Sequence, residues 1–283
     1  EKFASDEQKE KFLKPLASGE KLGAFSLTEP GSGSDAGDMK TTAVRDGDDY
    51  ILNGTKNFIT SGKSCDLMLV FVVTDKSKGS KGTSGFIVEK GMPGFEVGKK
   101  ESKLGIRASD TVSVSFENCR VPAANRIGDE GMGFKIALTA LNSGRIGVAA
   151  QALGIAQGAF EEAVKYSKER EQFNKPIAKF QAIQFKIARM ATDIETARLL
   201  LYSAAAKKDR HENFIKEAAM AKLHCSEVAV RTTLEAIQIH GGYGYVKEYP
   251  VERFMRDSKI TTIYEGTNEV MHLIIAENVI GRI

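Results

Sequence analysis

The stretch Thr111-Val-Ser-Val-Ser-Phe-Glu-Asn-Cys-Arg-Val-Pro122 marks the point where one kind of sequence gives way to another. Its first six residues alternate polar and apolar side chains, as a strand with one buried face requires. Before it, from Ala24 onward, short apolar runs are separated by glycine and by clusters of Ser, Asp and Asn. These spacings leave no room for the crossover helices of a parallel sheet. We therefore expect a middle, antiparallel, barrel-like β domain over residues 23–122.

After Pro122 the apolar residues recur every three or four positions, as in Ile183, Ile187, Met190 and Ile194. This period is typical of helices that bury one face. Turn residues or lost periodicity interrupt the pattern near positions 174–176, 208–213 and 241–244. The pattern predicts a C-terminal four-helix bundle over residues 123–283, with four long helices and a shorter terminal one. The fold class is α+β.

The first residues predict one short helix within residues 1–22. Ser5 and Gln8 have the spacing of a capping box, Phe12 begins an apolar face, and Gly19 ends the run. The chain has no initiator Met and opens inside a helical pattern. We interpret it as a fragment that begins near the end of a helical domain.

Composition excludes several classes of protein. The 283 residues, 42% hydrophobic and 27% charged, suit about two globular domains. The net charge of +3 is spread without a block of like charges, which argues against a nucleic-acid partner, and no apolar run is long enough for a membrane span. Cys65, Cys119 and Cys225 are far apart, and no histidine pair has metal-ligand spacing. We expect no metal and reduced surroundings, cytoplasmic in a bacterium or the mitochondrial matrix in a eukaryote.

The segment Thr28-Glu-Pro-Gly-Ser-Gly-Ser-Asp-Ala-Gly37 is rich in glycine. Its glycines are spaced one residue too widely for a dinucleotide fingerprint, and no βαβ unit surrounds them. Two interpretations remain. The loop holds a phosphate or polar ring with its amides and hydroxyls, or it is an ordinary surface turn.

Four further segments follow in order: Phe58-Ile-Thr60, Arg170-Glu-Gln-Phe173, Gln238-Ile-His-Gly-Gly242 and Tyr264-Glu-Gly-Thr267. Together with the glycine-rich segment they resemble the acyl-CoA dehydrogenases, and most of all the short-chain, butyryl-CoA branch, over essentially the whole chain. The resemblance implies a helical N-terminal domain, most of which is missing here, a middle β domain and a C-terminal four-helix bundle.

The resemblance implies a flavin enzyme. Desaturation between Cα and Cβ of a thioester needs a base for the α proton and an acceptor for the β hydride, and no side chain accepts hydride. The family uses FAD. The implied contacts to FAD in the same subunit are made by Phe25, Leu27, Thr28, Ser34, Phe58, Ile59 and Thr60. Taken alone, without the resemblance, Thr60 is better interpreted as a strand residue with a solvated hydroxyl.

In the family a second set of residues contacts the FAD of a neighbouring subunit, which implies a homotetramer. The corresponding residues here are Arg170, Phe173, Gln238, Gly241 and Gly242, and Gln181, Thr267 and Glu269 are carried over as further cofactor contacts. A simpler interpretation makes Gly241-Gly242 a helix C-cap and Arg170 a solvated charge at a helix end.

Glu265 is the residue that the resemblance assigns as the base. A carboxylate in an apolar, closed pocket has a raised pKa, which suits the removal of a carbon-bound proton. The alternative is an acid that stabilises the start of the last helix. Some relatives carry the base just before the arginine equivalent to Arg145, but that position is Gly144 here.

The resemblance also implies substrate contacts at Ser34, Asn142, Arg145, Tyr264 and Gly266, with the thioester carbonyl polarised by the amide of Glu265. Many members have Asp in place of Asn142, and Arg145 is alternatively a structural ion-pair partner. The implied activity is desaturation of short-chain acyl-CoA to trans-2-enoyl-CoA, with electrons passed to an electron-transferring flavoprotein.

Three alternatives share the fold. The first two, acyl-CoA oxidase and nitroalkane oxidase, use oxygen, and Glu265 counts against the second because nitroalkane oxidases carry Asp at the base position. The third is a non-catalytic DNA-binding flavoprotein, which needs a basic surface.

Overall fold

The computed structural model describes residues 1–281. Contacts within the chain divide it into two compact units. The first comprises Glu1–Lys103 and Arg107–Ala140, and the second comprises Leu104–Ile106 and the chain from Leu141 onward.

The N-terminal helix forms as its sequence predicts. It consists of α1 (Asp6–Gln8), a π-helical segment (Lys9–Leu13) and α2 (Lys14–Ser18). Ser5 Oγ accepts from the backbone N–H of Gln8 at 3.2 Å, and Gln8 Oε1 accepts from the backbone N–H of Ser5 at 3.0 Å, so the capping box is present. At the other end, Gly19 adopts the left-handed conformation that stops the helix.

The first unit is built on one sheet of eight strands. The strands are β1 (Gly23–Ser26), β2 (Thr42–Asp46), β3 (Asp49–Thr60), β4 (Leu67–Val73), β5 (Thr83–Glu89), β6 (Phe95–Lys100), β7 (Thr111–Pro122) and β8 (Arg126–Ile127). In β7, Val112, Val114 and Phe116 are buried, which confirms the alternation expected from the sequence. They belong to the hydrophobic core of this unit.

The sheet is open, with strand order β6-β7-β3-β2-β4-β5-β8 and β1 beside β4. Most neighbours are antiparallel, but β1 and β4 pair in parallel, as do Thr42 and Val73 of β2 and β4. The hairpin of β2 and β3 lies between β1 and β4 in the sequence, which gives the chain enough length to return for a parallel pairing. The α+β class is confirmed, with an open mixed sheet in place of a closed barrel.

The second unit is the helical bundle. Its helices are α3 (Gly133–Glu169, from Leu141 onward), α4 (Gln181–Asp209), α5 (Ile215–His240), α6 (Val251–Ser258) and α7 (Asn268–Ile280). The breaks fall where turn residues predicted them, and β9 (Glu171–Gln172) pairs with β10 (Lys175–Pro176) between α3 and α4. Only three of these helices are long, because the expected fourth divides into α6 and short 3-10 turns.

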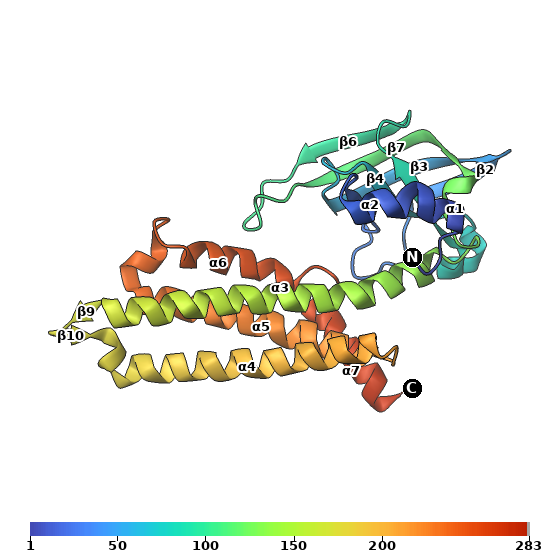
Figure 1. Cartoon of the computed structure of the whole chain (residues 1–283). Helices are drawn as coiled ribbons and strands as arrows, with labels where there is room; N and C mark the ends of the chain where they lie inside the picture. Colours follow the sequence, from blue (N-terminus) through green and yellow to red (C-terminus); the bar gives the residue numbers. More distant parts are fainter. Residues whose placement is uncertain (282–283) are drawn as a thin grey trace. The chain divides into compact units, whose positions relative to one another are not determined.

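Small side chains form the centre of the bundle. α3, α4 and α5 lie side by side in Figure 1, and Ala152, Ala197 and Ala229 are fully buried where the three helices meet. Small residues at such contacts bring helix axes close together. The positions of longer side chains that project from these helices are therefore closely fixed. None of the described helices is both long and apolar enough to cross a membrane.

Candidate active site

The predicted base lies on a short loop between a 3-10 turn (Lys259–Thr262) and α7. Thr267 is the N-cap of α7, and its hydroxyl accepts from the backbone N–H of Val270 at 3.3 Å. The two residues before it are left-handed, with φ of +56° at Glu265 and +90° at Gly266. Such a conformation at a residue other than glycine costs about 1–3 kcal/mol and persists only where the surroundings hold it.

Two cations from different helices hold this loop by its carbonyl groups. Arg145 of α3 donates from Nε to the Glu265 carbonyl at 3.3 Å, and its guanidinium also donates to Asn142 Oδ1 at 2.6 Å. Lys222 of α5 donates from Nζ to the Gly266 carbonyl at 2.7 Å. Both cations are buried. The structure thus brings Asn142, Arg145, Glu265 and Gly266 together, as the sequence predicts.

One oxygen of the Glu265 carboxyl group is buried without a hydrogen-bond partner. This oxygen is Oε2, which has no such partner within residues 1–281. Burial raises the pKa of Glu265, and the charges of Arg145 and Lys222 only partly oppose that shift. A Cβ atom at Gly144 would lie 2.7 Å from Oε2. Position 144 must therefore be glycine if the carboxyl group is to keep this place.

Tyr264 extends the site along α3. Its hydroxyl group is hydrogen-bonded to Gln151 Oε1, and burial, with Glu265 beside it, raises the pKa of the phenol to about 12. Tyr264 therefore stays neutral through the physiological range. Thr267 lies in the same loop, where its side chain caps α7, and Glu269 is exposed in the first turn of that helix.

In the first unit, β3 holds the start of the glycine-rich segment. Lys56 Nζ donates to the Leu27 carbonyl at 3.0 Å and to Glu29 Oε1 at 2.8 Å, and the backbone N–H of Asn57 donates to the Thr28 carbonyl at 2.8 Å. Leu27 and Thr28 therefore lie beside Phe58, as expected. The other predicted cofactor residues of this unit are also placed: Phe25 on β1 in ring contact with Phe71, Ser34 exposed in the loop, Ile59 buried and Thr60 exposed at the end of β3.

The pair of Lys56 and Glu29 is deeply buried, with 0% and 4% of the two side chains exposed. Burial would raise the pKa of Glu29, but hydrogen bonds from Lys56, Thr41 and Lys40 keep it below its ordinary value. Burial lowers the pKa of Lys56. Beside this anchor, Phe58 adopts a φ of +55° and leaves 63% of its surface exposed. An exposed aromatic ring on a fixed strand end suits contact with a planar ligand.

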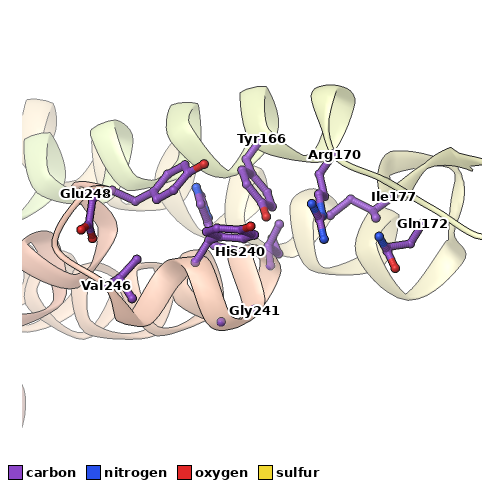
Figure 2. Close-up of a pocket in the computed structure, with 12 residues that line it drawn as sticks. Tyr166, Arg170, Gln172, Ile177, His240, Gly241, Val246 and Glu248 are labelled. Carbon is purple, nitrogen blue, oxygen red and sulfur yellow. The ribbon is translucent and has the colours of Figure 1, made fainter.

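A cavity of about 670 Å³ lies in the second unit at the end of α3 and α5. Tyr166 and Arg170 point into it in Figure 2, and Tyr166 stacks on His240 with ring centroids 4.2 Å apart. The cavity is also lined by Gly241 and Gly242, where an added Cβ would meet no atom within 4 Å. Gly241 is also the C-cap residue of α5, as the simpler interpretation of this glycine expects.

Other predicted residues lie outside the lining of this cavity. Gln238 and Gln181 are exposed on α5 and at the start of α4, and Phe173, on the turn between β9 and β10, is 86% exposed. Burial lowers the pKa of His240, and its Nε2 has no partner within the described residues. An arginine, two glycines and an unpaired imidazole nitrogen thus surround space large enough for part of a ligand.

The sequence did not predict Lys222, Gln151, Lys56 or Glu29 as parts of these sites. One signal was available for Lys222, since its helical neighbours Ala218, Ala219, Cys225 and Ser226 are small and are all buried. A lysine among such residues cannot point to solvent. No comparable signal distinguishes Gln151.

The three cysteines are buried free thiols. Burial raises the pKa of Cys119 to about 11 and that of Cys225 to about 12, so neither is a thiolate at neutral pH. Within residues 1–281, no group of three or more His, Cys, Asp or Glu side chains is arranged to hold a metal ion.

Two family models match the chain. Residues 24–119 match the one described as "Acyl-CoA dehydrogenase, middle domain", and residues 131–280 match "Acyl-CoA dehydrogenase, C-terminal domain". The chain is an enzyme of the acyl-CoA dehydrogenase family.

Two relatives and two solved structures show which members of that family are similar to this chain. The short-chain specific acyl-CoA dehydrogenase of Megasphaera elsdenii is 56% identical over 96% of this chain and 71% of the relative. The acryloyl-CoA reductase (NADH) of Anaerotignum propionicum is 55% identical over 99% of this chain and 72% of the relative.

Both solved structures have the same fold. That of butyryl-CoA dehydrogenase from Megasphaera elsdenii is 55% identical, with a TM-score of 0.97, and the match covers 99% of this chain and 73% of the other. A chain of the structure described as the electron transferring flavoprotein of Acidaminococcus fermentans is 56% identical, with a TM-score of 0.98 and coverage of 99% and 74%. The homologues of this chain thus include short-chain acyl-CoA dehydrogenases.

We expect Gly144→Ala to displace the Glu265 carboxyl group and to lower turnover of an acyl-CoA substrate by tenfold or more, because a misplacement of about 1 Å can cost about a hundredfold. The added Cβ would meet Oε2 at 2.7 Å, and this end of a side chain moves more easily than backbone. Stability should therefore change by no more than about 1 kcal/mol. Steady-state kinetics and chemical denaturation measure the two effects.

The matched control is Gly147→Ala on the same helix, where an added Cβ meets nothing within 4 Å. It should leave turnover unchanged. Equal turnover in Gly144→Ala and Gly147→Ala would contradict the close contact between position 144 and the carboxyl group.

Proposed function

We propose that this protein desaturates short-chain acyl-CoA thioesters to trans-2-enoyl-CoA, with FAD as its cofactor and an electron-transferring flavoprotein as its electron acceptor. One observation carries the proposal. Glu265 presents a buried carboxylate oxygen without a partner, on a left-handed loop that two cations hold in place. A helix-capping acid would face solvent at the helix N-terminus, and in this chain Thr267 performs the capping.

Glu265 is the proposed base for the α proton of the substrate. Its raised pKa brings the carboxylate closer to the basicity that removal of a carbon-bound proton requires. The backbone N–H of Glu265 has no backbone acceptor within the described residues. It is therefore free to donate to the thioester carbonyl and to stabilise the charge that develops there. Asn142, Arg145, Tyr264 and Gly266 frame the same space.

The residues present fit an anionic dinucleotide such as FAD. In the first unit, Phe58 offers an exposed ring, and the carbonyl contacts of Lys56 and Asn57 fix Leu27 and Thr28. In the second, the cavity combines Arg170 with two glycines. A guanidinium suits a pyrophosphate, and residues without Cβ atoms let the backbone approach it. When bound, FAD supplies the acceptor for the β hydride, which no side chain provides.

We assign the remaining predicted contacts to the same cofactor as part of this proposal. They are Phe25, Ser34, Ile59 and Thr60 within the subunit, Phe173 and Gln238 from a neighbouring one, and Gln181, Thr267 and Glu269 as further contacts. Contacts from a neighbouring subunit imply a homotetramer whose interfaces form through the bundle. Exposed apolar side chains on α4 support such an interface, since Phe185, Leu199 and Tyr202 are more than half exposed.

The name of the acryloyl-CoA reductase relative favours a second candidate, reduction of an enoyl thioester. The same site suits both directions, because Glu265 in its protonated form would return the proton to Cα. A bacterial cytoplasm or a mitochondrial matrix remains the proposed location.

The proposed function is tested first by Glu265→Gln. This variant keeps the shape of the side chain but accepts no proton, so the rate of anaerobic flavin bleaching by butyryl-CoA should fall by at least a thousandfold. General base catalysis alone contributes about 10²–10⁴-fold. Bound FAD, measured by absorbance, should stay at the wild-type level. Near-normal stopped-flow reduction would refute the assignment of the base.

The raised pKa of Glu265 has a separate signature in stability. An acid whose pKa is higher in the folded state stabilises the fold below its unfolded pKa, and that contribution is lost as pH rises through the folded pKa. The free energy of unfolding of wild type relative to Glu265→Gln should therefore fall as pH rises above about 4.3. Chemical denaturation across a pH series measures this difference. A flat difference would show that burial does not perturb Glu265.

Arg170→Ala should lower FAD retention more than it lowers the free energy of unfolding, because Arg170 lines the cavity but anchors no helix core. A filtration assay for flavin and chemical denaturation separate the two effects.

Light scattering on the wild type should give a tetramer. A stable monomer saturated with flavin would contradict the shared cofactor.

We expect the substrate preference to centre on four carbons. A buried methylene is worth about 0.8 kcal/mol, so kcat/KM should fall a few-fold for each carbon removed, and more steeply when a longer chain meets the pocket floor. Measurement of kcat/KM for C4 to C12 thioesters decides this. A maximum at eight carbons or more would place the enzyme in another branch of the family.

A further inference from the structure

Lys222 is a fully buried cation that has no part in the proposed proton transfer. Its side chain lies in α5 with 0% exposure. Nζ donates to the Gly266 carbonyl at 2.7 Å and to Asn268 Oδ1 at 3.0 Å, and both acceptors are neutral. A buried ammonium group carries a desolvation cost that hydrogen bonds to neutral acceptors only partly offset. The position of this charge beside the Glu265 loop therefore suggests a role other than stability.

The contacts of Lys222 all converge on the loop that carries Glu265. Gly266 directly follows Glu265, and Asn268 is the first residue of α7. Asn268 Oδ1 also accepts from Ser226 Oγ at 3.1 Å, so two donors on one turn of α5 hold the same atom at the start of α7. Arg145 holds the preceding carbonyl, that of Glu265. Successive carbonyl groups are thus fixed by cations from two helices, and this fixes the left-handed backbone at Glu265.

The charges around the Glu265 carboxyl group come from three helices. Arg145 on α3 and Lys222 on α5 are positive, and both favour the ionised carboxylate against the effect of burial. Tyr264, on the same loop, is a neutral phenol bonded to Gln151. Glu269 on α7 is exposed and adds a negative charge that acts on Lys222. Burial and the neighbouring Arg145 lower the pKa of Lys222 to about 8, so the ammonium form still dominates at neutral pH.

We propose that Lys222 is a positioning residue for the base: its hydrogen bonds to the Gly266 carbonyl and to Asn268 fix the loop, and its positive charge favours the ionised form of the Glu265 carboxyl group. This inference rests on the proposed role of Glu265 as the base. Lys222 would thus have two roles. Its hydrogen bond sets the geometry of the loop, and its charge favours ionisation of the Glu265 carboxyl group.

The test compares Lys222→Gln, which keeps a donor but loses the charge, with Lys222→Met, which loses both. The pH dependence of flavin reduction by butyryl-CoA in the flavin-loaded protein gives the midpoint for Glu265. We expect this midpoint to rise by about one pH unit in both variants, since a nearby opposite charge lowers the pKa of an acid by about 1–3 units. Only Lys222→Met should also lose at least tenfold in the high-pH plateau.

Two further variants guard against an effect on folding alone. Asn268→Asp leaves Lys222 in place but sets a carboxylate beside it, so the midpoint should again rise. Ser226→Ala removes only a hydrogen bond to Asn268 and should leave the midpoint unchanged. The midpoint is also obtained without turnover, from the pH dependence of the free energy of unfolding of each variant relative to the same variant carrying Glu265→Gln.

The outcomes distinguish this inference from the proposed function. If Glu265→Gln still reduces its flavin at a near-normal rate, the base assignment fails and the inference fails with it. If Glu265→Gln is inactive but the midpoint stays at the wild-type value in Lys222→Gln and Asn268→Asp, only the role of Lys222 is overturned. A midpoint that moves equally in Ser226→Ala would also overturn it, because that variant leaves the charge in place.

Discussion

The candidate active site depends on the hydrogen bonds that two buried cations donate to one loop. Arg145 and Lys222 hold the carbonyl groups of Glu265 and Gly266, and these hydrogen bonds help to offset the unfavourable left-handed backbone at Glu265. The cations in turn depend on the bundle. Helices that meet through alanines such as Ala152 leave little freedom for the long side chains that project from them. The packing of the core thus determines where the carboxyl group lies.

The first unit also contains a buried lysine that holds a loop, but there a carboxylate neutralises the charge of the lysine. There, too, a buried lysine, Lys56, donates to the carbonyl of a loop residue, Leu27. Its charge is matched by Glu29 at 2.8 Å, so the net effect of that pair on its surroundings is small. Lys222 has neutral acceptors instead, and its charge acts on Glu265. The first lysine anchors a loop, whereas the second can also change the ionisation of a neighbouring acid.

Sequence patterns predicted those features of the fold that depend on residues close together in the chain. The capping box of Ser5, the breaks between the long helices and the alternation in β7 all follow from spacing within a few positions. The parallel pairing of β1 with β4 and the open sheet depend on residues about forty positions apart, which no local pattern contains. The left-handed conformation of Glu265 is likewise set by distant cations. Its role was inferred from family resemblance, whereas its geometry required the structure.

The end of α5 shows why two interpretations of one motif need not compete. Gly241 ends the helix with a φ of +61°, which an L side chain rarely adopts, and the same lack of a Cβ atom leaves open space in the cavity beside Arg170. Helix ends carry backbone groups without helical partners. A glycine at such an end can stop the helix and, because it has no Cβ atom, can also leave room for a ligand. Thr267 caps α7 directly after the loop of Glu265 in a comparable way. In both places the residue that caps a helix also lies at the edge of one of the candidate sites.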